Sequence, residues 1–170
     1  MASRSPFSTL SPEIRAKVLE NNDFGDLIEY AEVSSEAKSD AIRVKPTICI
    51  QIAENEKDIL LVVSSENNRA ELFSWMFFHV KSDFVADISG ADDWKPKTIG
   101  GLTIKSRKEK NHAWTSICSD PVDSAVKVTL AILAISKWRH FHCPSTMKQL
   151  FWEKMKDTED ADKFLNILWS

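Results

Sequence analysis

The chain has 170 residues, of which 43% are hydrophobic and 28% are charged, and its formal net charge is −3. This length fits one large domain or a small module joined to a second domain, and the hydrophobic content excludes disorder over most of the chain. The slightly acidic balance argues against a nucleic-acid binder, whose domain is usually strongly basic.

The first predicted helix begins at Pro12. Ser11 precedes it as the cap, and a proline at the first helical position already has a backbone angle that suits a helix. The apolar residues that follow fall on one helical face: Ile14, Val18 and Leu19. The polar segment 21–25, which ends in a glycine, is expected to break the helix.

Two further short helices are predicted after this break. Asp26 is placed as the cap of the second helix. Either Ser34 or Ser35 is expected to cap a third helix that reaches Ile42. The helical region is therefore predicted to form a module over residues 5–45.

At Pro46 the hydrophobic period changes from 3.6 residues to two. Isoleucines alternate along residues 48–52, and residues 58–64 form a second, largely apolar strand. The charged turn between the two segments predicts an antiparallel hairpin. A second domain is therefore predicted over residues 46–170.

The middle of the chain mixes both periods. Asn68–Val80 carries apolar side chains at separations of three and four residues, which favours a mostly buried helix. Asp83–Ser89 alternates and is predicted to be a strand. A loop is expected over residues 90–101, which contain three glycines and a proline, and a short strand over Leu102–Lys105.

Val122–Trp138 fits both a helical and an alternating spacing, and its length and its alanines favour a helix. Phe141–Pro144 is expected to be extended and Ser145–Lys156 to be helical, and Thr158 is expected to cap a last helix. Together these elements predict an α+β fold, in which three N-terminal helices precede a β-hairpin and a domain of alternating helices and strands.

No catalytic set is recognisable in the sequence. Its four glycines include no phosphate-binding loop, and no cysteine opens a helix after a glycine-rich turn. His140, His142 and Cys143 could contribute to a zinc site with His112 or Cys118, but successive residues of an extended segment point to opposite sides, which separates Cys143 from the two histidines. We expect no enzymatic activity, no metal and no cofactor, with a small uncharacterised enzyme as an alternative.

The compartment is predicted from the cysteines and the apolar runs. Three cysteines at wide spacings oppose a disulfide framework and favour a reducing compartment. The first ten residues have no apolar signal core, and Val128–Ile135 is much shorter than the roughly 20 residues that span a bilayer. We expect a cytoplasmic or nuclear protein without a membrane or nucleic-acid partner. The basic residues of one short cluster are expected in a solvated loop: Lys105, Arg107, Lys108 and Lys110.

Residues 10–35 have more apolar positions than one short domain end can bury, which suggests a docking surface for another protein. Their spacing resembles the F-box pattern, which is Leu-Pro-x-Glu followed by two helices and a Val-Ser that opens a third. The matching positions are Leu10, Pro12-Glu13-Ile14, Lys17-Val18-Leu19, Asp26-Leu27-Ile28, Ala31 and Val33-Ser34. The sequence departs from the pattern at Ser11, Asn22 and Phe24, and no tryptophan follows Ser35.

The rest of the chain resembles nematode F-box proteins with an F-box-associated domain. The shared features are a hairpin like that over residues 47–64, a tryptophan-containing helix ending before a phenylalanine, as in LFSWMFFHVKSDF, and a late Phe-Leu-x-x-Trp helix, as in FLNILW with one more residue between. Members of this group are often longer, so this chain would carry a shortened target-recognition domain.

The resemblance implies a substrate-recognition subunit of an SCF-type (cullin) ubiquitin ligase. The F-box would dock on a Skp-type adaptor, and the second domain would hold an unidentified target protein. Six tryptophans are candidate target contacts, although most are expected in the core. The alternatives are an F-box-like interaction module or decoy without a ligase role, and a helical hairpin that packs only on its own sheet. The expected adaptor-binding residues are Leu10, Pro12, Glu13, Ile14, Val18, Leu19, Leu27, Ile28, Ala31 and Val33.

Overall fold

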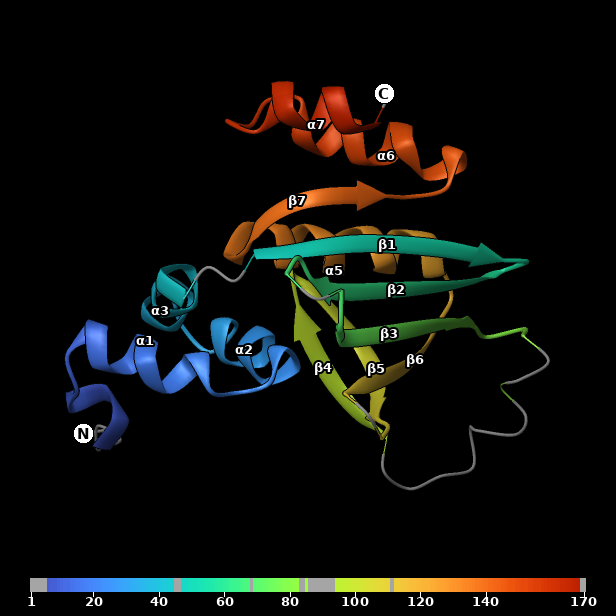
Figure 1. Cartoon of the computed structure of the whole chain (residues 1–170). Coiled ribbons are helices and arrows are strands. Elements are labelled where there is room, and N and C mark those ends of the chain that lie inside the picture. Colours follow the sequence, from blue (N-terminus) through green and yellow to red (C-terminus); the bar gives the residue numbers. More distant parts are fainter. Residues whose placement is uncertain are drawn as a thin grey trace.

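The computed structural model describes residues 6–44, 47–67, 69–82, 85, 94–110 and 112–168. Within these ranges the chain forms six α-helices and one seven-stranded mixed sheet, which confirms the α+β class. Three short helices lie beside the sheet, a longer helix covers one of its faces, and two helices stack beyond one edge (Figure 1).

The N-terminal elements are a 3-10 turn η1 (Pro6–Thr9) and the helices α1 (Pro12–Glu20), α2 (Phe24–Ala31) and α3 (Ser35–Val44). Each helix has a side-chain cap, as expected from short polar residues at its start. The Ser11 hydroxyl accepts from the N–H of Ile14 at 3.4 Å, which confirms the predicted cap of α1. Ser34, rather than Ser35, caps α3 by accepting from the N–H of Ala37 at 3.0 Å.

The second helix begins earlier than predicted. Asp23, not Asp26, is the cap, because its carboxylate accepts from the N–H of Asp26 at 2.9 Å. Gly25 does not lie in the break between the two helices but is buried in the first turn of α2. A β-carbon at Gly25 would lie 3.2 Å from the Trp114 ring, so this glycine permits the close approach of α2 to the sheet.

The sheet has the strand order β4-β5-β6-β3-β2-β1-β7. The β1–β7 and β3–β6 pairs are parallel, and the other pairs are antiparallel. The strands are β1 (Thr47–Asn55), β2 (Asp58–Ser65), β3 (Glu71–His79), β4 (Lys95–Ile99), β5 (Leu102–Lys108), β6 (Ala113–Cys118) and β7 (Lys137–His142).

The predicted hairpin is confirmed. β1 and β2 pair in an antiparallel register that places Ile50 opposite Val63 and Ile52 opposite Leu61, and all four side chains are buried. Because successive side chains of a strand point to opposite faces, these residues line one face of the sheet. That face forms the centre of the core.

The helix predicted over residues 68–80 is wrong, because this segment contains the central strand β3. Phe73, Trp75 and Phe77 are fully buried on the core face, and the residues between them are only half-buried. The sequence is apolar on both sides, so its side chains also satisfied helical spacing. Aromatic residues suit a strand with neighbours on both sides, and the pairing with β2 and β6 decides between the two structures.

The segment after β3 agrees only in part with the expectation. The strand predicted over residues 83–89 lies outside the described residues, except for position 85. β4 occupies part of the expected loop, and Gly100 and Gly101 form the turn to β5, which contains the predicted short strand. The basic cluster is not a solvated loop, because three of its four residues lie on β5. β6 was not predicted.

The C-terminal half begins with α5 (Pro121–Ile135), which confirms that most of the ambiguous segment is helical, but its last two residues, Lys137 and Trp138, belong to β7. The helix lies across the core face of the sheet, and the chain then enters β7 at the far edge (Figure 1). The helices α6 (Ser145–Met155) and α7 (Ala161–Leu168) were both expected, but Thr158 is not the cap of α7, because its hydroxyl donates to the backbone oxygen of Met155 at the end of α6. Four aromatic rings join the two helices to β7, with neighbouring centroids 5.0–6.3 Å apart: Trp138, Phe141, Phe151 and Phe164.

One continuous core joins the helical module to the sheet. Leu19, Phe24 and Ile28 belong to the same buried cluster as the isoleucines of β1 and the aromatic residues of β3. The ring of Phe24 lies 6.1 Å from that of Phe73. The change from helices to strands falls between Val44 and Thr47, at the predicted boundary, but packing does not stop there.

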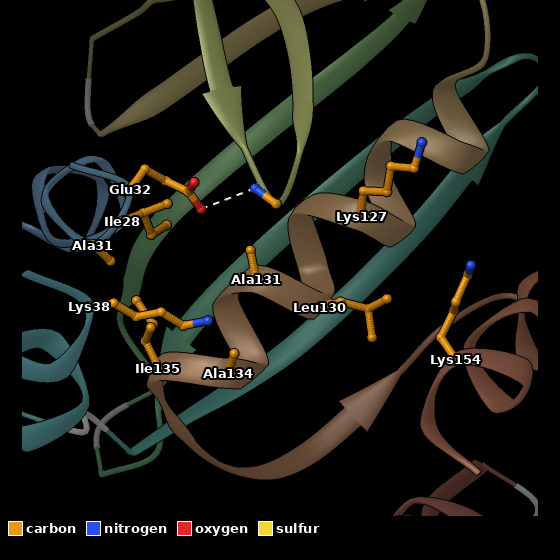
Figure 2. Close-up of a pocket in the computed structure, with 11 residues that line it drawn as sticks. Ile28, Ala31, Glu32, Lys38, Lys127, Leu130, Ala131, Ala134, Ile135 and Lys154 are labelled. Carbon is orange, nitrogen blue, oxygen red and sulfur yellow. Dashed lines mark hydrogen bonds between the residues drawn. The ribbon is translucent and has the colours of Figure 1, made fainter. Parts of the chain in front are cut away.

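The β4–β5 turn is fixed against α5 and α2. The N–H of Gly100 donates to Glu32 at 3.0 Å, as the dashed line in Figure 2 shows. A β-carbon at Gly100 would lie 2.9 Å from the backbone oxygen of Lys127, whereas no described residue lies within 4 Å of a β-carbon at Gly101. Both glycines have positive φ angles, +60° and +79°.

We therefore expect Gly100→Ala to destabilise the protein more than Gly101→Ala. Both substitutions place an L residue in the left-handed region, at a cost of about 1–2 kcal/mol. Only Gly100→Ala adds a backbone overlap, which is expected to cost about 1–3 kcal/mol more. Urea unfolding of both variants and the wild-type chain measures this difference, and equal midpoints for the two variants would contradict the packing described for the turn.

Candidate docking surfaces

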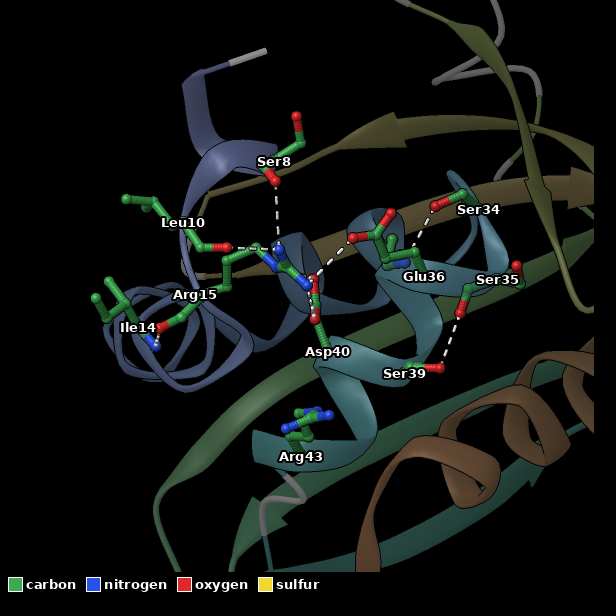
Figure 3. Close-up of polar contacts among 12 residues, drawn as sticks. Ser8, Leu10, Ile14, Arg15, Ser34, Ser35, Glu36, Ser39, Asp40 and Arg43 are labelled. Carbon is green, nitrogen blue, oxygen red and sulfur yellow. Dashed lines mark hydrogen bonds and ion pairs between the residues drawn. The ribbon is translucent and has the colours of Figure 1, made fainter. Parts of the chain in front are cut away.

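A buried ion pair holds the helical module together. Arg15 of α1 and Asp40 of α3 are 6% and 1% exposed, and the guanidinium makes two contacts to the carboxylate, Nε at 2.9 Å and Nη2 at 3.1 Å. Nη1 also donates to the backbone oxygen of Leu10 at 2.8 Å (Figure 3). The pair and its hydrogen bonds therefore fix α1, α3 and the segment before α1 to one another.

Tyr30 connects α2 to the same carboxylate. Its hydroxyl donates to Asp40 at 2.8 Å, and its ring packs almost perpendicular to that of Phe7 at a centroid distance of 5.7 Å. Burial and, next, the hydrogen bond to Asp40 raise the pKa of Tyr30 to about 12. One carboxylate thus joins all three helices.

The ten expected adaptor-binding residues fall into two groups. Leu19, Leu27, Ile28 and Ala31 are buried in the protein's own core, so they could contact a partner only after leaving it. Leu10 and Pro12 are half-buried, and four are exposed at the surface: Glu13, Ile14, Val18 and Val33.

An apolar stripe runs along the outer side of α1. We define it as Leu10, Ile14 and Val18. Ile14 and Val18 are four residues apart and therefore lie on one face of α1, and Leu10 lies just before the helix begins. Ile14 and Val18 are 49% and 43% exposed. In Figure 3 the side chains of Leu10 and Ile14 point away from Asp40 and α3. The stripe is thus on the side of α1 opposite the buried ion pair.

The sequence did not reveal one exposed apolar residue of the module or the ion pair in its interior. Ile42 of α3 is 39% exposed and was not among the expected contacts, although its place at the end of an amphipathic helix was visible. Arg15 and Asp40 gave no signal, because residues 25 positions apart meet only through the packing of α1 on α3.

A second surface is a half-open cavity of about 400 Å³ between the module and α5. Its floor is apolar and comes mainly from α5, with Leu130, Ala131 and Ala134, and from Ile28 of α2. Three lysines from three helices stand around it, Lys38 of α3, Lys127 of α5 and Lys154 of α6 (Figure 2). These lysines lie far apart in the sequence, and no sequence pattern predicted that they line the same cavity.

One residue of the basic cluster, Lys108 of β5, pairs with acidic residues of α2. Lys108 Nζ lies 3.4 Å from Asp26 and 3.5 Å from Glu29. Lys97 of β4 also forms an ion pair with Glu29, and its Nζ lies 3.4 Å from the centre of the Trp114 ring. Burial lowers the pKa of Lys97. These contacts fasten the β4–β5 hairpin to the helical module.

The residues considered for zinc or thiol chemistry do not gather. Within the described ranges, no three His, Cys, Asp or Glu residues are placed to hold a metal ion. His140 and His142 are exposed and Cys143 is buried. Burial raises the pKa of both Cys118 and Cys143 to about 11, which disfavours the thiolate that nucleophilic chemistry requires.

The tryptophans belong mostly to the interior. Trp75, Trp114 and Trp138 are at most 4% exposed, Trp94 and Trp152 are half-buried, and Trp169 lies outside the described residues. In the part of the chain that the structure describes, no helix has the length and apolar character needed to cross a membrane.

Tyr30 is the only tyrosine of the chain, so tyrosinate absorbance reports on this site alone. We expect the native protein to titrate near pH 12, above the value of about 10 for an exposed phenol. Because the folded pKa is raised, the stability that the neutral phenol contributes is complete below about pH 10 and is lost as the pH rises through about 12. Asp40→Asn should lower the midpoint, with circular dichroism monitoring the fold; an unchanged midpoint would contradict the contact.

Loss of the buried carboxylate should weaken the module more than loss of its exposed neighbour. Glu36 also pairs with Arg15, at 3.2 Å, but its side chain is 67% exposed. Asp40→Asn leaves the Arg15 charge buried without its partner, whereas Glu36→Gln removes only a solvated contact. Urea unfolding should show a clear fall in midpoint for the first variant and little change for the second.

Comparison of the chain with protein-family models, with curated proteins and with solved structures finds no match, so these comparisons assign it to no family.

Proposed function

We propose that the chain is the substrate-recognition subunit of an SCF-type ubiquitin ligase, in which the helical module docks on a Skp-type adaptor and the sheet domain holds a target protein. The observation that carries the proposal is the apolar stripe on α1, whose residues keep the F-box spacing and remain at the surface after the module has formed its core. A cullin would join through the adaptor, so the chain itself needs no catalytic residue.

The stripe suits a helix-packing interface. Three aliphatic side chains four residues apart can enter the groove of a partner, and exposed apolar residues at such spacing are the anchors of helix-in-groove recognition. Charged residues flank the stripe, since Glu13 is exposed and pairs with Arg43 of α3 at 3.7 Å. An apolar centre with a polar rim is the usual anatomy of a protein interface.

The ion pair behind α1 supports the same role. It fixes the backbone that presents the stripe, so little conformational freedom is lost when a partner binds. The predicted adaptor contacts therefore reduce to Leu10, Pro12, Glu13, Ile14 and Val18 on this side of the module, together with Val33 in the turn that follows α2. The four buried residues act in packing the module on the sheet.

We expect Ile14→Asp combined with Val18→Asp to abolish co-purification with the Skp-type adaptor. Two carboxylates in the centre of an apolar interface would be desolvated without partners, which weakens binding strongly. The matched control is Leu150→Asp combined with Leu165→Asp, because these side chains on α6 and α7 are 44% and 42% exposed. Isothermal titration of the purified full chains against the adaptor gives the affinities.

Adaptor binding that survives the α1 substitutions, or that is lost equally in the control, would refute this docking surface. Ubiquitin transfer to a co-purifying protein, dependent on the same α1 residues, separates a ligase receptor from a decoy that only occupies the adaptor.

A further inference from the structure

We propose that the cavity between the helical module and α5 is the target-binding site, and that it takes a short acidic peptide segment with an aliphatic side chain. We call this cavity the lysine groove and define it by Lys38, Lys127, Lys154, Leu130 and Ala134. That the bound peptide belongs to a ligase target rests on the proposed function. The groove's preference for an acidic and aliphatic peptide follows from its own chemistry.

The floor of the groove favours an aliphatic side chain. α5 buries one side against the sheet, and its opposite side carries Leu130, Ala131 and Ala134, which are not buried. The small alanines leave space between α3 and α6, and the volume of about 400 Å³ falls within the range of ligand sites. Burial of an aliphatic group there would remove apolar surface of both partners from water.

The rim of the groove favours negative charge. The ammonium groups of Lys38 and Lys154 form no ion pair with any described residue, and Lys127 pairs only with the exposed Asp123 of its own helix, at 3.0 Å. The one acidic residue of the lining, Glu32, is engaged by the N–H of Gly100 at 3.0 Å. The three lysines therefore present a net positive potential above an apolar floor.

This combination points to a peptide and not to a nucleic acid. Among the described residues that line the groove there is no arginine, which binds phosphate through two hydrogen bonds, and no aromatic ring, on which a base could stack. A peptide segment with alternating acidic and aliphatic residues would place its aliphatic side chain on α5 and its carboxylates near Lys38 and Lys154, which approach from opposite sides (Figure 2). None of the three stripe residues is among the residues that line the groove, so the two surfaces do not overlap.

The test is selection of binders from a library of random heptapeptides by the purified full chain. We expect the selected peptides to be enriched in sequences that combine acidic and aliphatic residues.

The groove variant is Lys38→Glu combined with Lys154→Glu, and the matched control is Lys57→Glu combined with Lys110→Glu, which makes the same charge change at exposed sites elsewhere. The best peptide should bind the groove variant about tenfold or more weakly and the control nearly as well as wild type.

A second variant tests the floor without changing charge. Ala134→Trp should fill the groove and weaken the same peptide, because this exposed alanine can be enlarged without disturbing the core. Absence of acidic and aliphatic enrichment, equal loss of binding in the control, or binding unaffected by both groove variants would overturn the proposal.

Adaptor affinity measured on the same proteins keeps the two proposals distinct. Groove variants should retain it. A chain that selects acidic peptides but does not bind the adaptor would refute the ligase role and leave the peptide site standing. A chain that binds the adaptor but selects no such peptides would refute the peptide site and leave the ligase role standing.

Discussion

The buried pair of Arg15 and Asp40 is the constraint on which the N-terminal half depends. A charged group removed from water must be fully paired, and here one carboxylate receives the guanidinium of α1 and the phenol of α2 from its position on α3. The same guanidinium binds the carbonyl of Leu10, where the apolar stripe begins. The polar interior of the module thus determines which apolar residues remain outside, because α1 cannot rotate without breaking the pair.

The module and the sheet cannot be treated as independent units joined by a linker. α2 packs through Phe24 on the Phe73 ring of β3, and Gly25 allows contact with Trp114 of β6. Ion pairs from β4 and β5 reach Asp26 and Glu29 of the same helix. In the proposed receptor this shared core would hold the adaptor-docking stripe and the lysine groove in a fixed relation, so that a bound target is presented to the ligase at a constant orientation.

Local signals predicted the elements with clear boundaries. The Ser11 cap with Pro12 placed α1, alternating isoleucines placed β1, and the 15-residue α5 was recognised by its length and alanines. The failure at β3 has a specific cause. Phe73, Trp75 and Phe77 face the core while Leu72, Met76 and Phe78 are half-buried on the other side, so neither period stands out in a run that is apolar on both faces. Only pairing with β2 and β6 distinguishes the strand.

The candidate sites divide in the same way. The apolar excess of residues 10–35 and its spacing are properties of the local sequence, since caps and helical periodicity act over a few residues. Which of those residues stay exposed depends on contacts between positions far apart, such as Arg15 with Asp40 and Phe24 with Phe73. The lysine groove has no local sequence signature. Lys38, Lys127 and Lys154 come from three helices and line one cavity only after the chain has packed around α5. Periodicity predicts the face of a helix, but burial is decided by the partner that the fold places against it.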